Sequence, residues 1–304
     1  MMRKQLSVLL FAAALLTTGC ARMIAGESQR GDRDLKERDE MRQSYQLSPG
    51  ARVEVAGISG IVKINTANTD TAEINIVRYA ATRAALEHHK ITVDHSAGSL
   101  SVRGEKDDSS VHSMLAHLFT RSSEVRQEVT LKLPRNVQLF TNGVNGRVTI
   151  GEVDGAVAVH GVNGRVEIAQ ALDHAEVNGV NGGVTMTLAK LGEKGVSIHG
   201  VNGGIELRFA GDVNASVDVH GINGSVRSDA PDIVVEKDKD DRSNVSAQIG
   251  KGGAPVSLHG INGGVRLSRL TATAARSVDN ENAQTKKTDS VADNDSGGSK
   301  EDDE

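Results

Sequence analysis

A nine-residue phrase occurs six times between residues 142 and 267, and this repetition constrains the fold more than any other feature of the chain. The phrase reads His/Asn-Gly-Val/Ile-Asn-Gly-x-Val/Ile-x-apolar. Its copies are Asn142–Ile150, His160–Ile168, Asn178–Met186, His199–Leu207, His220–Ser228 (which ends on a polar residue) and His259–Leu267. Repetition of this kind is typical of arrays of one structural unit. The sequence therefore predicts a stack of near-identical units.

The spacing of the copies gives the size of a unit. The central Asn residues are 145, 163, 181, 202, 223 and 262, so the intervals are 18, 18, 21, 21 and 39 residues. The last interval equals one 18-residue unit and one 21-residue unit together. It predicts one unit that has lost the motif.

Both flanks of the phrase alternate between apolar and polar residues, as in Val157-Ala-Val159 before the Gly and Val166-Glu-Ile168 after the turn. A period of two indicates half-buried β-strands. The Gly-apolar-Asn-Gly between the strands predicts a corner, because Gly and Asn tolerate positive φ. The predicted turn residues are Asn145, Gly146, Asn163, Gly164, Asn181, Gly182, Asn202, Gly203, Asn223, Gly224, Asn262 and Gly263.

Two all-β architectures fit this pattern. Asn-Gly is commonly the tip of a β-hairpin, but it also suits the corner of a β-solenoid, a single-domain stack of 18–21-residue coils. Near-constant coil length and like residues at like positions favour the solenoid. The aromatic content of 2% agrees, since a narrow coil interior suits small aliphatic side chains.

A degenerate seventh copy, Val53–Ile64, places Ser59 where the other copies have Asn. Strand-like stretches at 72–79, 90–94, 100–103 and 128–133 separate it from the first full copy. They predict irregular first coils or a cap, which a solenoid needs to protect its edges. The apolar spacing of Ser109–Arg121 predicts a short helix over one end.

The N-terminus predicts the compartment. Arg3 and Lys4 precede an apolar stretch, Leu6–Leu16, which is too short to span a bilayer comfortably. The sequence then reads Leu16-Thr-Thr-Gly-Cys20, which resembles a bacterial lipobox, although Thr17 stands where Leu is commonest. We expect residues 1–19 to be a signal peptide and Cys20, the sole cysteine, to carry the lipid. Ala21 after the cysteine favours the outer membrane.

Composition divides the rest of the chain. Residues 20–44 are predicted to form a tether, whose alternating charges also suit a solvated helix, and residues 45–270 the β domain. Residues 271–304 lack periodicity and end in acidic residues, which predicts a disordered tail. With a net charge of −5 and no basic patch interleaved with aromatics, no nucleic-acid partner is expected.

The Gly-Ile-Asn corners at 221–223 and 260–262, and Gly-Val-Asn at the other four, are similar to those of the putative-adhesin family of bacterial envelope proteins, which includes the head GIN domains. Strand 128–133, Pro134 and then 137–141 also resemble the lead-in to that family's repeats. The resemblance covers roughly residues 45–270. It implies a β-solenoid exposed at the cell envelope, and no catalytic residue.

Histidine occupies the first motif position in four copies, at 160, 199, 220 and 259. Of these, His199 and His220 are predicted to lie in consecutive coils, as a weak metal site or a pH-sensitive pair. Two ligands fall short of a zinc site, so a polar corner column is favoured. The Asn residues are expected to stack and to form hydrogen bonds along the axis.

The remaining candidates are weak. Insertion 229–253 starts an Asp-x-Asp pattern but has Ser243 and Ile249 where a calcium loop has Gly and Glu, so a solvated loop is expected. Glu167, Glu206, Arg227 and Arg266 point outward and are expected to serve solubility. No cofactor is expected.

The sequence favours a non-catalytic, lipid-anchored envelope protein that presents its solenoid for adhesion, scaffolding or protein interaction. Self-association through the solenoid ends is an additional expectation. The alternatives are a carbohydrate-binding or carbohydrate-active module on the same fold and an accessory of the envelope-stress response.

Overall fold

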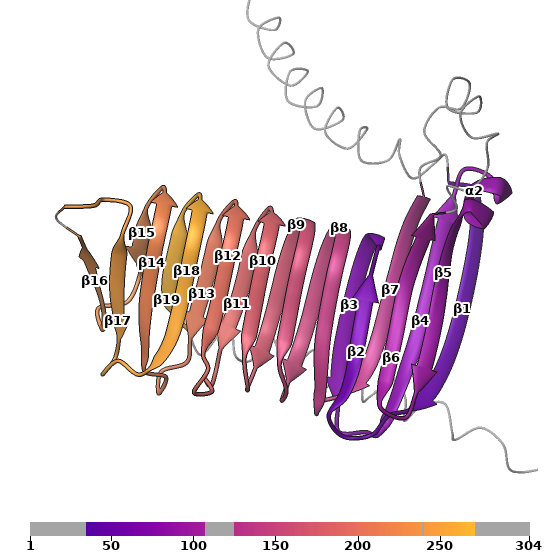
Figure 1. Ribbon diagram of the computed structural model, residues 1–304, viewed down its shortest axis with the longest axis horizontal. Coiled ribbons are helices and arrows are strands. Elements are labelled where there is room, and N and C mark those ends of the chain that lie inside the picture. Colours follow the sequence, from indigo (N-terminus) through magenta and orange to yellow (C-terminus); the bar gives the residue numbers. More distant parts are fainter. Residues whose placement is uncertain (1–34, 107–124, 239, 271–304) are drawn as a thin grey trace, which may run out of the picture.

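The computed structural model describes residues 35–106, 125–238 and 240–270. Within them the chain is all-β, as predicted, and 19 strands belong to one open hydrogen-bonded sheet. The sheet folds over into two rows of strands, which Figure 1 shows as an elongated stack. The predicted signal peptide, Cys20, the predicted helix at 109–121 and the predicted tail all lie outside the described residues.

The first row holds the strands that precede the corners. Hydrogen bonding gives the spatial order β5 (His89–Ser96), β6 (Ser99–Lys106), β2 (Ala51–Ala56), the first half of β8 (Val137–Val153), the first half of β9 (Val157–Ala171), β10 (Ala175–Asn181), β12 (Val196–Asn202), β18 (Ala254–Asn262), β14 (Ala215–Asn223), β17 (Val245–Ile249) and β16 (Ile233–Lys237).

The second row holds the strands that follow the corners. Its order is β1 (Glu37–Gln46), β4 (Thr71–Ala80), β7 (Val125–Pro134), β3 (Ser59–Ala67), the second halves of β8 and β9, β11 (Val184–Leu188), β13 (Ile205–Phe209), β19 (Val265–Arg269) and β15 (Val226–Ser228). A six-residue helix, α2 (Arg83–His88), is the only helix in the described part of the chain. It is neither long nor apolar enough to cross a membrane.

Motif-bearing units pair in parallel and in register, so equal motif positions face each other from unit to unit. Asn145 pairs with Asn163, for example, and Val148 with Val166. The degenerate copy joins the same register, since Ser59 pairs with Asn145. Like residues therefore form continuous columns along the stack.

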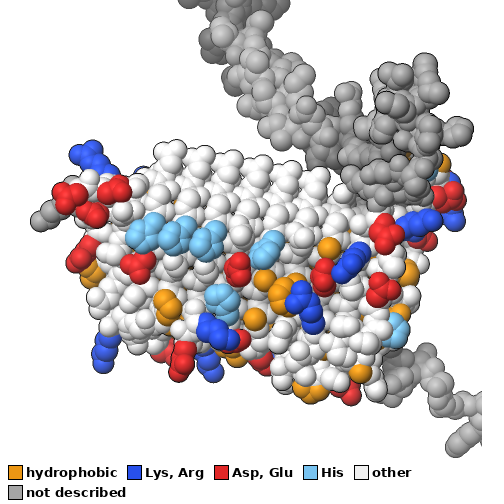
Figure 2. All heavy atoms as spheres, in the orientation of Figure 1, with side chains coloured by type: hydrophobic (Ala, Val, Ile, Leu, Met, Phe, Trp, Pro, Cys, Tyr) orange, Lys and Arg blue, Asp and Glu red, His pale blue; other side chains and the backbone are white. Residues whose placement is uncertain are grey.

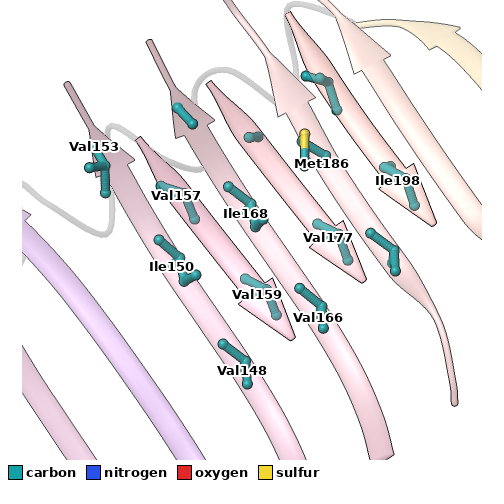
Figure 3. Packing of buried hydrophobic residues seen from close by; sticks show 14 of the residues in the cluster. Val148, Ile150, Val153, Val157, Val159, Val166, Ile168, Val177, Met186 and Ile198 are labelled. Atoms are coloured by element: carbon teal, nitrogen blue, oxygen red, sulfur yellow. The ribbon is translucent and has the colours of Figure 1, made fainter. Parts of the chain in front are cut away.

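The core lies between the two rows. Most inward residues of the strands are Val, Ile, Leu, Met or Ala, with exposed fractions of 0–8%. Phe209 is a buried aromatic residue among them, and Thr141 a buried polar one. Figure 3 shows these aliphatic side chains in register on neighbouring strands, with Val148, Ile150, Val166 and Ile168 after the corner and Val157, Val159 and Val177 before the next one. Each such side chain stabilises the fold by about 1.5–3 kcal/mol relative to exposure.

The order of the units corrects one prediction. Strand β18 pairs with β12 on one side and with β14 on the other, so the Asn262 unit lies between the Asn202 and Asn223 units. Figure 1 shows β18, the yellow strand, between them. The 39-residue interval is therefore not a unit that lost its motif. It is the length of chain needed to form β16 and β17 and to return.

Segment 229–253 corrects a second prediction, because much of it is a cap and not a solvated loop. Strand β17 pairs antiparallel with the outer side of β14, and β16 pairs antiparallel with β17. Val245, Ala247 and Ile249 are buried against the end of the core. The acidic turn between the two strands remains exposed and uses Asp238 and Asp241 as acceptors for its own backbone N–H groups.

The N-terminal end of the stack also differs from the sequence prediction. Residues 37–44 belong to β1, antiparallel to β4, and are not a tether. Met41 and Tyr45 pack against the core, while charged residues occupy the other side of this edge strand. The strand-like stretches 72–79, 90–94, 100–103 and 128–133 are confirmed as parts of β4, β5, β6 and β7.

Candidate functional site

The two glycines of each corner have different structural requirements. The first, such as Gly200, has φ +61°, and a Cβ built on it would lie 3.7 Å from its nearest neighbour. The second, such as Gly203, has φ +157°, and its Cβ would lie 2.1 Å from the carbonyl oxygen of Gly182 in the preceding unit. The same collision recurs at the equivalent glycines of the stack. The second glycine thus permits the close approach of successive backbones.

The corner Asn residues do not have the positive φ expected from the sequence, since all described residues with positive φ are glycines. Their side chains instead form a ladder along the stack. In the series 145, 163, 181, 202, 262 and 223, the amide NH₂ of each Asn after the first donates to the Oδ1 of the preceding Asn over 3.0–3.1 Å. The hydrogen-bonded ladder expected from stacking is present, and it follows the spatial order of the units.

Three histidines form a contiguous row at the first motif position. His259 lies between His199 and His220, with ring centroids 5.1 Å apart on each side and the rings nearly parallel. Figure 2 shows this row as adjoining pale-blue side chains on one face. The prediction that His199 and His220 are neighbours is therefore wrong, because the Asn262 unit separates them. His160 is apart from the row, since Asn178 occupies the intervening unit.

The hydrogen bonds of this row are local. Nε2 of His199 is 2.6 Å from Oγ of Ser197, and Nε2 of His259 is 3.0 Å from Oγ of Ser257. Nδ1 of His220 is 3.3 Å from Oδ1 of Asn244 in the C-terminal cap. Among the described residues, no group of three His, Cys, Asp or Glu is arranged to hold a metal ion. The row acts as a polar column whose last member bonds to the cap.

A shallow groove of about 910 Å³ crosses the second row immediately after the corners. Its floor is the glycine column Gly183, Gly204 and Gly264, continued by Ser225. These residues occupy the position where the two preceding units carry Arg147 and Arg165. The walls of the groove are polar or charged: Arg165, Thr185, Glu206, Arg227, Asp229 and Arg266.

Ion pairs order two sides of this groove. Nε of Arg266 is 2.6 Å from Asp229, and the guanidinium of Arg208 contacts Glu206 at 2.9–3.0 Å. The hydrogen bond from Arg208 holds the pKa of Glu206 below its ordinary value against the opposing effect of burial, and the positive charges of Arg208 and Arg266 lower it further. Glu206 is thus ionised at neutral pH. A carboxylate in this state accepts hydrogen bonds and does not act as a general acid.

The groove was missed from the sequence, although its components were visible there. Three of the four outward residues named from the sequence, Glu206, Arg227 and Arg266, line the groove, while Glu167 does not. The available signal was the residue after each Asn-Gly, which changes from Arg in the first two units to Gly or Ser in the other four.

No protein-family model matches the sequence, and no relative is found among curated proteins. Solved structures with a similar course of the chain include a candidate cell adhesion protein from Clostridium sporogenes, at 11% identity and a TM-score of 0.38, covering 76% of this chain and 100% of that chain. A candidate adhesin from Bacteroides fragilis matches at 11% identity and a TM-score of 0.29, covering 76% of this chain and 97% of that chain. A candidate lipid-binding protein from Parabacteroides distasonis matches at 9% identity and a TM-score of 0.25, covering 77% of this chain and 97% of that chain.

Proposed function

We propose that this protein is a non-catalytic lipoprotein of the bacterial cell envelope that presents a β-solenoid as a rigid binding surface for adhesion, scaffolding or protein interaction. The observation that carries the proposal is the in-register stacking of the motif units. It turns each outward position of the motif into a column of repeated side chains. A partner with a matching repeat can then make the same contact several times, which raises its avidity without any new type of contact.

The electrostatics of the groove support a binding surface over an active site. Hydrolysis of a glycosidic bond requires one carboxyl group with a raised pKa as the acid and a second as base or nucleophile. Here the pKa of Glu206 is lowered, and Asp229 is engaged by Arg266. Both carboxylates are better suited to accepting hydrogen bonds than to donating protons.

The location at the envelope rests on the lipobox-like sequence that ends at Cys20. Several acyl chains would hold the protein firmly, because each buried methylene contributes about 0.8 kcal/mol. The pair Arg3 and Lys4 with Leu6–Leu16 supplies the export signal, and Ala21 favours the outer membrane.

The test combines acyl labelling with membrane fractionation of the wild type and of Cys20→Ala in a bacterial host. We expect labelled, membrane-associated wild type and an unlabelled variant released from the membrane. Cells that display the wild type should also adhere to a partner surface better than cells with Cys20→Ala. Unlabelled, freely soluble wild type would refute the anchor, and equal adherence of the two would refute the role in adhesion.

A further inference from the structure

The groove on the second row has the dimensions of a site for an extended ligand. It runs along the stack from Arg165 through the units of Gly183, Gly204 and Gly264 to that of Ser225. That path is four inter-strand steps of about 4.8 Å, or about 19 Å. A compact ligand would contact only part of this length, whereas a linear polymer can follow the columns.

The backbone conformation of the floor does not require glycine at positions 183, 204 and 264. None of Gly183, Gly204 and Gly264 has positive φ. A Cβ built on them would lie 3.7–3.9 Å from its nearest neighbour, which is ordinary van der Waals contact. Side chains would therefore fit at these positions, in contrast to the glycine that precedes each of them. A side chain at any of these three positions would instead fill part of the groove.

The charge of the groove favours an anionic ligand. Three guanidinium groups, from Arg165, Arg227 and Arg266, line it against the carboxylates of Glu206 and Asp229. Asp229 forms an ion pair with Arg266, and Glu206 forms one with Arg208, which does not line the groove. Arg227 is exposed and takes part in none of the ion pairs among the described residues. Arg165 reaches Glu167 at 4.0 Å, the outer limit of an ion pair. A guanidinium fork binds a carboxylate through two parallel hydrogen bonds.

The hydrogen bonding of the floor disfavours a peptide. The carbonyl groups of Gly183, Gly204 and Gly264 already accept from the N–H groups of Val166, Val184 and Ile205. The floor therefore offers no strand edge that a peptide backbone could extend. The ionised side chains of an acidic peptide would also bring only acceptors to the two groove carboxylates.

A sugar chain fits these partners better. Its hydroxyl groups can donate to Glu206 and Asp229 and can exchange hydrogen bonds with Thr185 and Ser225. The glycine column of the floor has no side chains and lets sugar rings approach the backbone. None of the described residues that line the groove is aromatic, so recognition would depend on hydrogen bonds and charge.

We propose that this groove binds an extended acidic polysaccharide, with its carboxylates on Arg165 and Arg227 and its hydroxyls on the groove carboxylates. This ligand deepens the proposed function, since it names what the binding surface of the envelope protein would hold.

Binding is tested by calorimetric titration of the purified full chain in detergent with polygalacturonate, a linear polymer of uronic acids. We expect binding that weakens as the salt concentration rises, because exposed charge pairs are screened. Neutral dextran should not bind, and poly-L-glutamate should bind more weakly than polygalacturonate. Absence of polygalacturonate binding, or equal or tighter binding of poly-L-glutamate, would overturn the proposal.

Three variants locate the site. Arg165→Gln combined with Arg227→Gln should weaken binding by about tenfold or more, whereas Arg147→Gln, at the same motif position one unit outside the groove, should leave it unchanged. Gly204→Gln should weaken binding by filling the floor, without lowering the melting temperature. If Arg147→Gln weakens binding as much as the double variant, the interaction is general electrostatic attraction and the assignment of the groove fails.

The outcomes separate this inference from the proposed function. Protein that is acylated and anchored but does not bind polygalacturonate contradicts the ligand alone. Protein that binds polygalacturonate but is not anchored contradicts the envelope location alone.

Discussion

Replacing one glycine of an adjacent pair should unfold the corner, while replacing the other should not. In Gly203→Ala, the new Cβ would lie 2.1 Å from the carbonyl oxygen of Gly182 and 2.6 Å from its carbon, at φ +157°. In Gly204→Ala, the Cβ would lie 3.8 Å from its nearest neighbour, without positive φ. The two variants change the chain by the same methyl group at neighbouring positions.

The expected magnitudes differ in sign. Holding a residue at a sparsely populated φ destabilises the folded state by about 1–3 kcal/mol. Forcing a methyl group into packed structure destabilises it by about another 1–3 kcal/mol. Gly203→Ala should therefore destabilise the protein by about 2–6 kcal/mol. Gly204→Ala should be neutral or stabilising by up to about 1 kcal/mol, because it lowers the entropy of the unfolded chain.

Urea denaturation followed by circular dichroism measures both effects, with the slope of the transition showing whether the stack still unfolds as one unit. Gly200→Ala is a useful third variant, since φ there is +61° but the Cβ has room at 3.7 Å. It should lose only the conformational part, about 1–2 kcal/mol. If Gly203→Ala and Gly204→Ala shifted the midpoint equally, the close approach of successive backbones would not determine the glycine column.

Three further perturbations test other parts of the structure. Asn262→Ala removes two bonds of the ladder and Asn223→Ala only one, so we expect losses of about 1–2 and 0.5–1 kcal/mol in urea denaturation; equal losses would contradict additive ladder bonds. Ile249→Asp places a charge in the fully buried side of the cap. It should lower the free energy of unfolding by more than 3 kcal/mol and cause association by exposing the edge of β14, as measured by thermal melting and light scattering. Val234→Asp, at a site 55% exposed, should do neither. Because the folded-state pKa of Glu206 is lowered, its ion pair stabilises the protein above the ordinary carboxyl pKa, and this stabilisation is lost as the pH falls through the folded-state value; Glu206→Gln should flatten the acid side of the stability profile, and identical profiles would refute this.

The repeat itself was sufficient to predict the strands and their burial. Alternation around Val157–Val159 and Val166–Ile168 depends only on neighbouring residues, and almost every side chain between the two rows is apolar, with Thr141 as an exception. The lead-in strands near 72–79 and 128–133 were visible for the same reason. Edge strand β1 was not, because a strand with one unpaired side tolerates charges that resemble those of a linker.

Spatial order was not predictable from spacing. An interval of 39 residues is compatible with a unit that lost its motif and with an excursion that returns between two earlier units. Only hydrogen bonding on both sides of β18 distinguishes them. The error extended to the candidate site, since His259 and not His220 is the neighbour of His199. The groove was also hidden, because it arises from the absence of side chains at 183, 204 and 264 in adjacent units.

The position of β18 has a consequence for how the stack is assembled. A chain that emerges from its N-terminus completes residues 215–228 before residues 254–267, yet the later unit lies inside the earlier one. The Asn223 unit and its cap cannot dock on β12 first without occupying the place of the last unit. Assembly therefore has to wait until residue 267 is available, and a chain cut at residue 253 would lose an internal layer, not its end. The last unit of the β domain in sequence therefore joins the units before it to the Asn223 unit and the cap.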